Sequence, residues 1–452
     1  MNFESILRGI FGLALLIGIA FLLSNNKKKI NWRLVFSGFI LQIIFAILIL
    51  KGDQLRNIFY PLAWPKDFFN SVSYVFVLIL NFTTDGAKFV FGNLALAPGN
   101  PGNLGFFFAF QVLPTIIFFA SLMSVLYYLG IMQKIVQGMA WVMAKVMGTS
   151  GAESLSCTAN IFVGQTEAPL MVKPFIKTMT QSELLTIMIG GMATIAGGVM
   201  AAYVQMLGSA YAAAHHVGLV QAQQMFATQL LGGSFMAAPG AMMIGKILIP
   251  EISESETKGK IKIDIDKNAS NVIEAAANGA GDGLTLALNV GAMLIAFIAF
   301  IALINYLLNL LGDATGFNAY LVSNFGQPLS FQLIIGLVLQ LVAYGIGVPG
   351  QDALTFGSLL GTKIVLNEFV AYSDMGNLVQ AGKLVNEKTI LMITYALCGF
   401  ANFSSIAIQI GGLGPLAPNR KSDIAALGIK AVIGGTITTL LTATLGGLFF
   451  SL

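Results

Sequence analysis

The hydrophobic positions of the chain gather in long runs that short polar stretches separate. A helix that spans a bilayer needs about 20 predominantly apolar residues. Nine runs are candidates, although Gly and Met interrupt the fifth. They cover residues 6–23, 34–50, 106–129, 184–206, 224–249, 284–311, 331–344, 389–410 and 424–452. The pattern predicts an all-α polytopic membrane protein.

Three further segments do not fit a simple span. Residues 68–91 mix aromatic side chains with Asn70, Asn81, Asp85 and Lys88, which predicts a helix that lies in the membrane interface. Residues 135–147 have a similar pattern. Residues 251–267 form the one long polar stretch, for which we expect a solvated linker or a short hairpin.

Composition and charge support the membrane class and narrow the function. Of the 452 residues, 56% are hydrophobic and 10% are charged, whereas soluble proteins are about 25% charged. The net charge of +4 forms no basic stripe, so nucleic acid is not an expected partner. The two cysteines are far apart and the two histidines are adjacent, so neither a disulfide framework nor a histidine metal site is expected.

The basic residues also predict an orientation. Lys27, Lys28, Lys29 and Arg33 crowd the first loop, which should therefore be cytoplasmic and leave the N-terminus outside. No small-residue cleavage site follows the first apolar run, so we expect an uncleaved first transmembrane helix.

Two segments are too polar to cross lipid alone and too apolar to be loops. In residues 149–180, Pro169 and Pro174 stop a continuous helix. In residues 347–370, Pro349, Gly350 and Gly361 do the same. Irregular backbone at membrane depth is tolerated only inside protein or beside water. We therefore predict two re-entrant helical hairpins, the first with its tip near residues 163–168.

Each hairpin precedes a helix with small or polar residues in its middle, at 190–198 and at 399–405. Paired interrupted segments in two halves are typical of transporters with inverted repeats and a binding site near the midplane. The sequence therefore predicts a secondary transporter. There is no Walker A pattern for ATP-driven transport, and no nucleophile–base pair or Cys/His metal motif for an enzyme.

Glu167 is the first candidate binding residue, because an ionisable group at membrane depth is costly and usually functional. Gln165 and Thr166 beside it add neutral donors and acceptors, which suits a solute with many hydroxyl groups. The alternative is that Glu167 only caps backbone N–H groups at the hairpin tip.

Glu368 is the second candidate, and its alternative role is an ion pair with Lys363, five residues earlier. Asn402 and Ser405 are three apart and would share a helix face, where they either bind solute or join helices. Phe400 would reach the site only if its helix unwinds.

A coupling cation needs hard oxygen ligands, including backbone carbonyls. Asn160 and the carbonyl of Val163 precede the first tip, and Thr194 with the carbonyl of Ile195 lies in the first interrupted helix. The alternative for Thr194 is a hydrogen bond back to its own helix.

Three stretches, 164–169 (GQTEAP), 361–369 (GTKIVLNEF) and 399–405 (GFANFSS), resemble the signatures of concentrative nucleoside transporters. The resemblance covers nearly the whole chain, in the short bacterial form. It implies about eight transmembrane helices, interfacial helices and two opposed hairpins. It also implies a homotrimer in a bacterial inner membrane, in which each protomer moves its substrate by an elevator-like shift.

The resemblance further implies roles for matching residues. Gln165, Thr166 and Glu167 would face the nucleobase, and Val199 and Phe400 would pack against it. Glu368, Asn402 and Ser405 would hold the ribose. Asn160, Val163, Thr194 and Ile195 would line a sodium site, and the hydroxyl of Thr194 favours sodium over protons as coupling ion. No cofactor is implied, and a uridine-like nucleoside is the expected substrate.

The expected division of the chain follows from these segments. Residues 1–148 are N-terminal transmembrane and interfacial helices on the scaffold side, and residues 149–250 are the first hairpin with its following helices. Residues 251–283 are a polar linker with an interfacial helix, residues 284–330 a long scaffold helix, and residues 331–452 the second hairpin with the interrupted and C-terminal helices.

Four alternatives to a sodium-coupled nucleoside symporter remain at this stage. A proton-coupled nucleoside symporter would share the substrate site. An elevator transporter for another polar solute, such as an amino or dicarboxylic acid, is disfavoured by two glutamates in the site. A membrane enzyme would need a catalytic pair or metal ligands, and a channel would need acidic rings without the neighbouring amides and hydroxyls.

Overall fold

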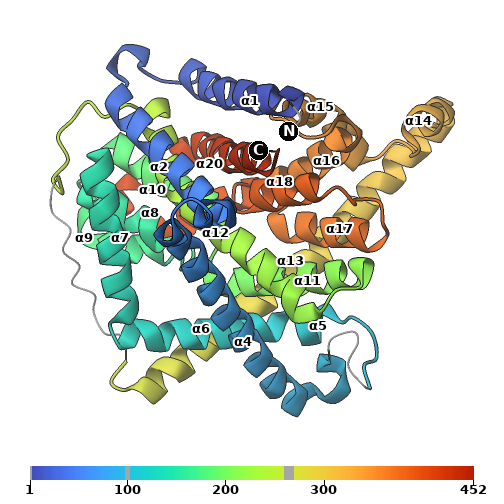
Figure 1. The fold of residues 1–452 in the computed structure, drawn as a ribbon, viewed down its shortest axis with the longest axis horizontal. Helices are drawn as coiled ribbons and strands as arrows, with labels where there is room; N and C mark the ends of the chain where they lie inside the picture. The colour runs from blue at the N-terminus through green and yellow to red at the C-terminus, as the bar shows by residue number, and fades with distance from the viewer. Residues whose placement is uncertain (1–2, 97–101, 259–268, 452) are drawn as a thin grey trace.

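The computed structural model describes residues 3–96, 102–258 and 269–451, and these form helices and no strands (Figure 1). Helices are expected because backbone polar groups inside a bilayer must pair within the spanning segment. The α-helices are α1 Phe3–Leu22, α2 Trp32–Leu50, α3 Gly52–Arg56, α4 Trp64–Phe91, α5 Phe108–Gln111, α6 Leu113–Tyr128, α7 Ile131–Met147, α8 Gly151–Ala159, α9 Lys173–Ile176, α10 Gln181–Ala193, α11 Gly197–His215, α12 Leu219–Leu248, α13 Val272–Ala314, α14 Phe317–Phe325, α15 Phe331–Gly345, α16 Ala353–Val365, α17 Glu368–Gln380, α18 Glu387–Leu397, α19 Phe403–Leu413 and α20 Lys421–Ser451. Short 3-10 turns are η1 Lys27–Lys29, η2 Tyr60–Ala63, η3 Gly92–Ala95, η4 Ala168–Val172, η5 Gly350–Asp352 and η6 Pro418–Arg420.

Eight helical segments of the described chain are long and apolar enough to cross a membrane. The two ends of the described chain lie together, because α1 packs along α20 and the hydroxyls of Ser5 and Ser451 lie 3.0 Å apart (Figure 1).

One of the eight contains the segment expected in the membrane interface, residues 68–91. This segment belongs to α4, which has 28 residues and therefore a length of about 42 Å. Its charged residues, Lys66, Asp67, Asp85 and Lys88, lie in the first and last two turns. Its length and composition would allow it to cross a membrane, and the interfacial orientation expected from the sequence stays a prediction.

The two hairpins are present. In the first, α8 descends to an irregular tip at 160–167, and η4 and α9 return. In the second, α16 leads to a tip at Leu366 and Asn367, and α17 returns as far as Gln380, ten residues beyond the predicted end. The predicted span at 331–344 is α15, only 15 residues long, and it packs along α16. It is therefore an arm that feeds the hairpin and not a separate crossing.

Both predicted interruptions are real breaks. The segment 184–206 divides into α10 and α11 at residues 194–196, and the segment 389–410 divides into α18 and α19 at residues 398–402. The breaks touch each other at Gly399, which has a φ of +145°. A Cβ there would lie 2.6 Å from the carbonyl oxygen of Met192. Only glycine allows both this backbone conformation and this contact.

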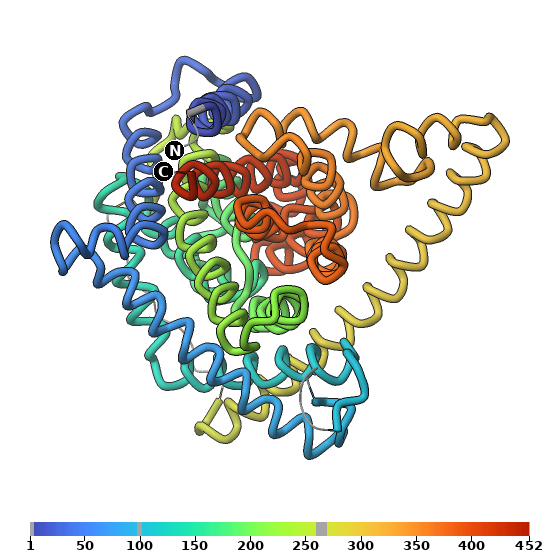
Figure 2. Tube along the Cα trace, turned by 45° about the vertical axis from the view of Figure 1, so that its right-hand side comes forward, coloured from blue at the N-terminus to red at the C-terminus, as the bar shows by residue number. Residues whose placement is uncertain are grey.

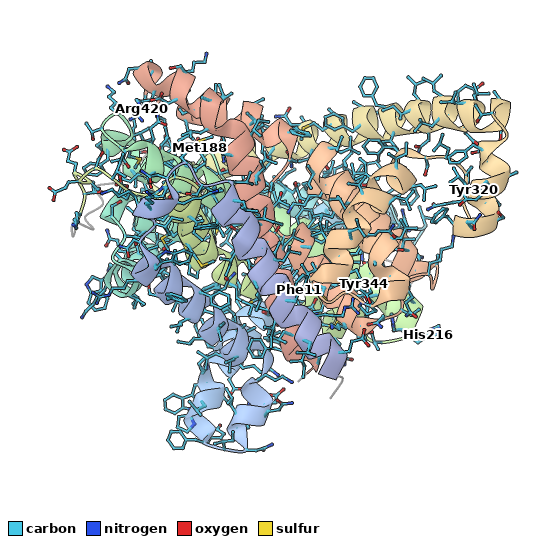
Figure 3. All side chains as sticks on the ribbon, turned by 90° about the horizontal axis from the view of Figure 1, so that it is seen from above. Phe11, Met188, His216, Tyr320, Tyr344 and Arg420 are labelled. Carbon is cyan, nitrogen blue, oxygen red and sulfur yellow. The ribbon has the colours of Figure 1, made fainter. Side chains whose placement is uncertain are left out.

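The centre of the molecule is built by α10, α11, α12 and α20, whose residues are mostly buried. In contrast, α13 is largely exposed and runs away from the body towards α14 (Figure 2). Tyr320 of α14 lies at the far end of this arm, well away from Arg420 (Figure 3). Near its start α13 packs closely on α6, where Gly279 and Gly283 leave room for the backbone of α6.

The expected interfacial helix in 251–283 is not a separate element. That helix and the scaffold helix after it are one continuous α13 of 43 residues, which starts at Val272 and passes position 283 without interruption. Residues 259–268 of the expected linker lie outside the described residues.

The described start of the polar linker is not merely solvated. The carbonyl of Thr257 accepts from Gly151 N at 3.0 Å, and the Thr257 hydroxyl accepts from Ala152 N at 3.2 Å. Glu251 accepts from Lys246 Nζ at 3.0 Å and from the hydroxyl of Thr180 at 2.9 Å. The segment therefore ties both ends of the first hairpin to α12.

Glu153 of α8 is buried, with 1% of its surface exposed. One carboxylate oxygen accepts from Ser150 N at 2.7 Å, and the other lies 2.8 Å from Lys246 Nζ. Its place is explained by the capping box of α8 and by the buried cation from α12.

Candidate solute and cation site

Glu368 lies where the second hairpin turns. Asn367 caps α17 by accepting from Val370 N at 3.0 Å, which places Glu368 in the first turn, with 3% of its surface exposed. Its Oε1 accepts from the hydroxyl of Tyr203 at 2.9 Å, and its Oε2 accepts from Asn402 Nδ2 at 3.0 Å. Among the described residues Glu368 forms no ion pair with Lys363, so the structural ion-pair alternative fails.

Asn402 and Ser405 do come together, although not as predicted on the face of a regular helix. Asn402 has extended backbone and is the N-cap of α19, where its Oδ1 accepts from Ser405 N at 2.8 Å. The cap orients the amide so that its Nδ2 points to Glu368. Because the helix is broken at 398–402, Asn402 caps α19 and at the same time bonds to Glu368 of α17.

Gln165 connects the first hairpin to this group. Its Nε2 donates to the Ser405 hydroxyl at 3.1 Å, and its Oε1 accepts from Gln409 Nε2 at 3.1 Å. Through Ser405 and Asn402, the tip of the first hairpin and the carboxylate of the second belong to one hydrogen-bonded network.

Glu167 occupies the tip itself and is exposed, whereas Glu368 is buried. Its Oε2 accepts from Gly164 N at 2.8 Å, so the capping alternative is observed. This contact uses one carboxylate oxygen. Thr166 beside it packs on α19, because the missing side chain of Gly412 leaves room for its methyl group.

The two expected base-packing residues lie at the breaks. Val199 is buried in the first turn of α11. Phe400 is half-buried in the irregular stretch between α18 and α19, so the unwinding that its role requires is present.

The expected cation ligands lie where the first tip meets the first break. Asn160 is buried, and its Nδ2 donates to the carbonyl of Ser156 at 3.0 Å. Its Oδ1 has no hydrogen-bond partner among the described residues. A buried acceptor without a donor is uncommon and requires an explanation, such as a bound ion. Phe162, next to Val163, accepts from Gly197 N at 3.0 Å, which joins the tip to α11.

Thr194 ends α10 in extended conformation, and its hydroxyl donates back to the carbonyl of Gly190 at 2.8 Å. The back-bonding alternative is therefore also observed. It uses the hydroxyl hydrogen and leaves oxygen lone pairs for a cation. Ile195 follows in the break and is buried.

Sequence reasoning missed Tyr203, Gln409 and the structural role of Lys363. Tyr203 and Gln409 each carry one polar group in an apolar run, a pattern that most often means packing. Gln409 follows Ser405 by four residues, so helical spacing alone would have placed it on the same face.

A cavity of about 630 Å³ lies between α13 and the pair α11 and α17. Its lining is mostly apolar, and none of the network residues Gln165, Glu368, Asn402 and Ser405 lines it. We therefore assign the solute site from the network and not from this cavity.

Comparison with known proteins identifies the class. The model for the sodium-dependent nucleoside transporter C-terminus matches residues 229–447, the corresponding N-terminal model matches 11–94, and a nucleoside recognition model matches 109–210. The chain belongs to the family of sodium-dependent nucleoside transporters.

Relatives and solved structures agree with this family. An uncharacterised transporter of Haemophilus influenzae is 46% identical over 99% of both chains. The nucleoside permease NupC of Helicobacter pylori is 40% identical over 100% of this chain and 99% of its own. The transporter CNTnw, in an inward-facing substrate-bound state, matches with a TM-score of 0.83 at 40% identity over 98% of both chains.

The predicted family, helical fold, multi-pass membrane class and transport function are thus confirmed, with sodium as the coupling ion. The relatives are transporters, which separates this chain from the membrane-enzyme alternative.

Proposed function

We propose that this protein imports nucleosides together with sodium through the site formed by the two hairpin tips and the two helix breaks. The observation that supports it most is Glu368, a buried carboxylate held by Tyr203 and Asn402. Burying a carboxylate is costly. Such a group can accept strong, directional hydrogen bonds from sugar hydroxyls in a low-dielectric site.

The residue roles follow from the network. Glu368, Asn402 and Ser405 hold the ribose, and Gln165, Thr166 and Glu167 face the base. Val199 and Phe400 pack against the base from the two breaks. The first turns of α11 and α19 both begin at the breaks, and helix N-termini favour electron-rich groups of a bound solute.

Sodium binds at Asn160, Val163, Thr194 and Ile195 in this proposal. The unpaired Oδ1 of Asn160 and the lone pairs of Thr194 are hard oxygen donors, and the carbonyls of Val163 and Ile195 would complete the set. The first tip and the first break both belong to the site. Sodium would therefore hold them together and favour solute binding, and by linkage the solute would favour sodium.

Transport is by an elevator-type movement of the hairpin body against a scaffold. The buried body and the outlying α13 support this division (Figure 2). The transporter CNTnw has been solved in outward-facing, inward-facing and three intermediate states, and each of these structures is similar to this chain in fold.

We further propose a homotrimer in a bacterial inner membrane, with a uridine-like nucleoside as substrate. Exposed apolar side chains on the outlying arm, such as Tyr306, Leu310 and Phe317, support an assembly through α13 and α14. Such patches mark contact with lipid or with protein. Native mass spectrometry in detergent would show a trimer mass, and a monomer at all concentrations would refute the assembly.

Uptake into proteoliposomes tests the function. We expect uridine uptake that an inward sodium gradient stimulates and that Glu368→Gln reduces at least about tenfold, since charged hydrogen bonds contribute about 1.5–3 kcal/mol. Uptake driven by a proton gradient alone would keep the substrate and reject the sodium site. No nucleoside uptake by folded wild-type protein would reject the substrate.

A further inference from the structure

Two residues that have no role in the proposal above, Tyr203 and Gln409, each form a hydrogen bond with a recognition side chain. In both cases the two partners come from opposite halves of the chain. Tyr203 follows the first hairpin and bonds to Glu368 of the second. Gln409 follows the second hairpin and bonds to Gln165 of the first. We propose that Tyr203 and Gln409 are positioning residues, Tyr203 for selectivity towards the sugar and Gln409 for selectivity towards the base. This inference rests on the proposed function.

Tyr203 is fully buried, so it does not present its surface to a solute. Among the described residues its hydroxyl bonds to Glu368 alone, at 2.9 Å. Its ring is fixed by Phe369 and Tyr372, with centroids at 4.7 and 4.5 Å. The phenol of Tyr203 is therefore a rigid donor, and its one hydrogen bond goes to Oε1 of Glu368.

The consequence is a fixed carboxylate plane. Tyr203 holds Oε1 and Asn402 holds Oε2, so neither oxygen can rotate away without losing a bond. Each carboxylate oxygen has a second lone-pair direction. Those directions are set before the solute arrives, which lowers the ordering cost of binding a sugar hydroxyl.

Gln409 does the same for Gln165. Its Nε2 donates to Gln165 Oε1 at 3.1 Å and to the carbonyl of Met188 at 2.9 Å, so both of its N–H groups are used. Oε1 of Gln165 therefore points to Gln409, and Nε2 of Gln165 points to Ser405. An amide has two N–H groups. Gln165 therefore presents its remaining N–H, a donor that suits a carbonyl oxygen of a base.

The test measures dissociation constants by calorimetry in sodium. The ligands are uridine, 2′-deoxyuridine, 3′-deoxyuridine and cytidine. Two ratios of dissociation constants are compared. The sugar ratio divides the constant of the more weakly bound deoxyuridine by that of uridine. The base ratio divides the constant of cytidine by that of uridine. A residue that only stabilises the fold would change all four constants together and leave both ratios unchanged.

For Tyr203→Phe, which keeps the ring, we expect the sugar ratio to fall about tenfold while the base ratio stays within about twofold. For Gln409→Met, which keeps the volume, we expect the base ratio to change about fivefold and the sugar ratio to stay. Should Tyr203→Phe not fold, Tyr203→Met removes the same hydroxyl and carries the same expectation.

Two other buried side chains with one hydrogen bond each provide matched controls. Tyr372→Phe removes a buried hydroxyl that donates to the carbonyl of Thr394 at 2.8 Å, and it keeps the ring that packs on Tyr203. Gln223→Met removes a buried amide that donates to Gln205 at 2.5 Å. Both should leave the two ratios unchanged.

The outcomes separate the two proposals. If wild-type protein binds and transports no nucleoside, the proposed function fails and this inference fails with it. If the wild type transports uridine but Tyr203→Phe and Gln409→Met leave both ratios unchanged, only the positioning roles are overturned.

Discussion

Lys363 donates from the inside of α16 to the carbonyl of Ala396, one residue before the end of α18, with 2.8 Å between Nζ and O. The lysine is fully buried, and its second contact is the Thr439 hydroxyl at 3.3 Å. The last carbonyls of a helix lack partners and carry partial negative charge. The second hairpin thus supplies the cation that stabilises the broken helix beside it.

Lys363→Met should therefore destabilise the protein by about 2 kcal/mol, because it removes a hydrogen bond from a charged donor and leaves a buried carbonyl unpaired. Thermal melting of the purified protein measures this. Lys383→Met, at an exposed position after α17, should melt as the wild type does. Equal melting temperatures for both variants would show that Lys363 does not support the break.

Gly399→Ala should be strongly destabilising. The position has a φ of +145°, and an added Cβ would lie 2.6 Å from the Met192 carbonyl oxygen. Backbone strain alone costs about 1–3 kcal/mol, and the contact is with backbone that cannot rotate away. Gly411→Ala in α19, which has open space around it, is the control. A Gly399→Ala protein with wild-type melting and uptake would mean that the breaks are not in contact.

Thr194→Val tests the cation site, since it keeps the shape and removes the oxygen. We expect the sodium concentration for half-maximal uridine uptake to rise at least about tenfold, because one ligand is lost. The control is Thr186→Val in the same helix, whose hydroxyl also donates to a carbonyl four residues earlier, at 2.8 Å. A sodium dependence equally changed in both variants would argue for a purely structural effect.

Lys246→Met should destabilise the base of the first hairpin by about 3–5 kcal/mol, because Glu153 would remain buried without its cation. Combining it with Glu153→Gln should recover part of the loss, as expected for coupled residues. The exposed pair of Arg56 and Asp67 provides the contrast, since Arg56→Met should cost at most about 1 kcal/mol. Additive effects of Lys246→Met and Glu153→Gln on melting would refute the coupling.

Several features were predictable from local sequence because local chemistry decides them. Apolar runs of sufficient length gave most spans, and proline and glycine gave both hairpins and both breaks. The residues of the candidate site were named from the cost of charges at membrane depth and from a family resemblance.

The sequence by itself determined the membrane class, the hairpins and the residues that are too polar for their surroundings. Only the tertiary structure decided which of them meet. Tyr203 and Glu368 are 165 residues apart, and Gln165 and Gln409 are 244 apart, so no local pattern could pair them. The same holds for Glu153, whose burial depends on Lys246 from α12. A polar side chain is stable in the interior only when its partner is placed there too, and that placement is a property of the packed helices.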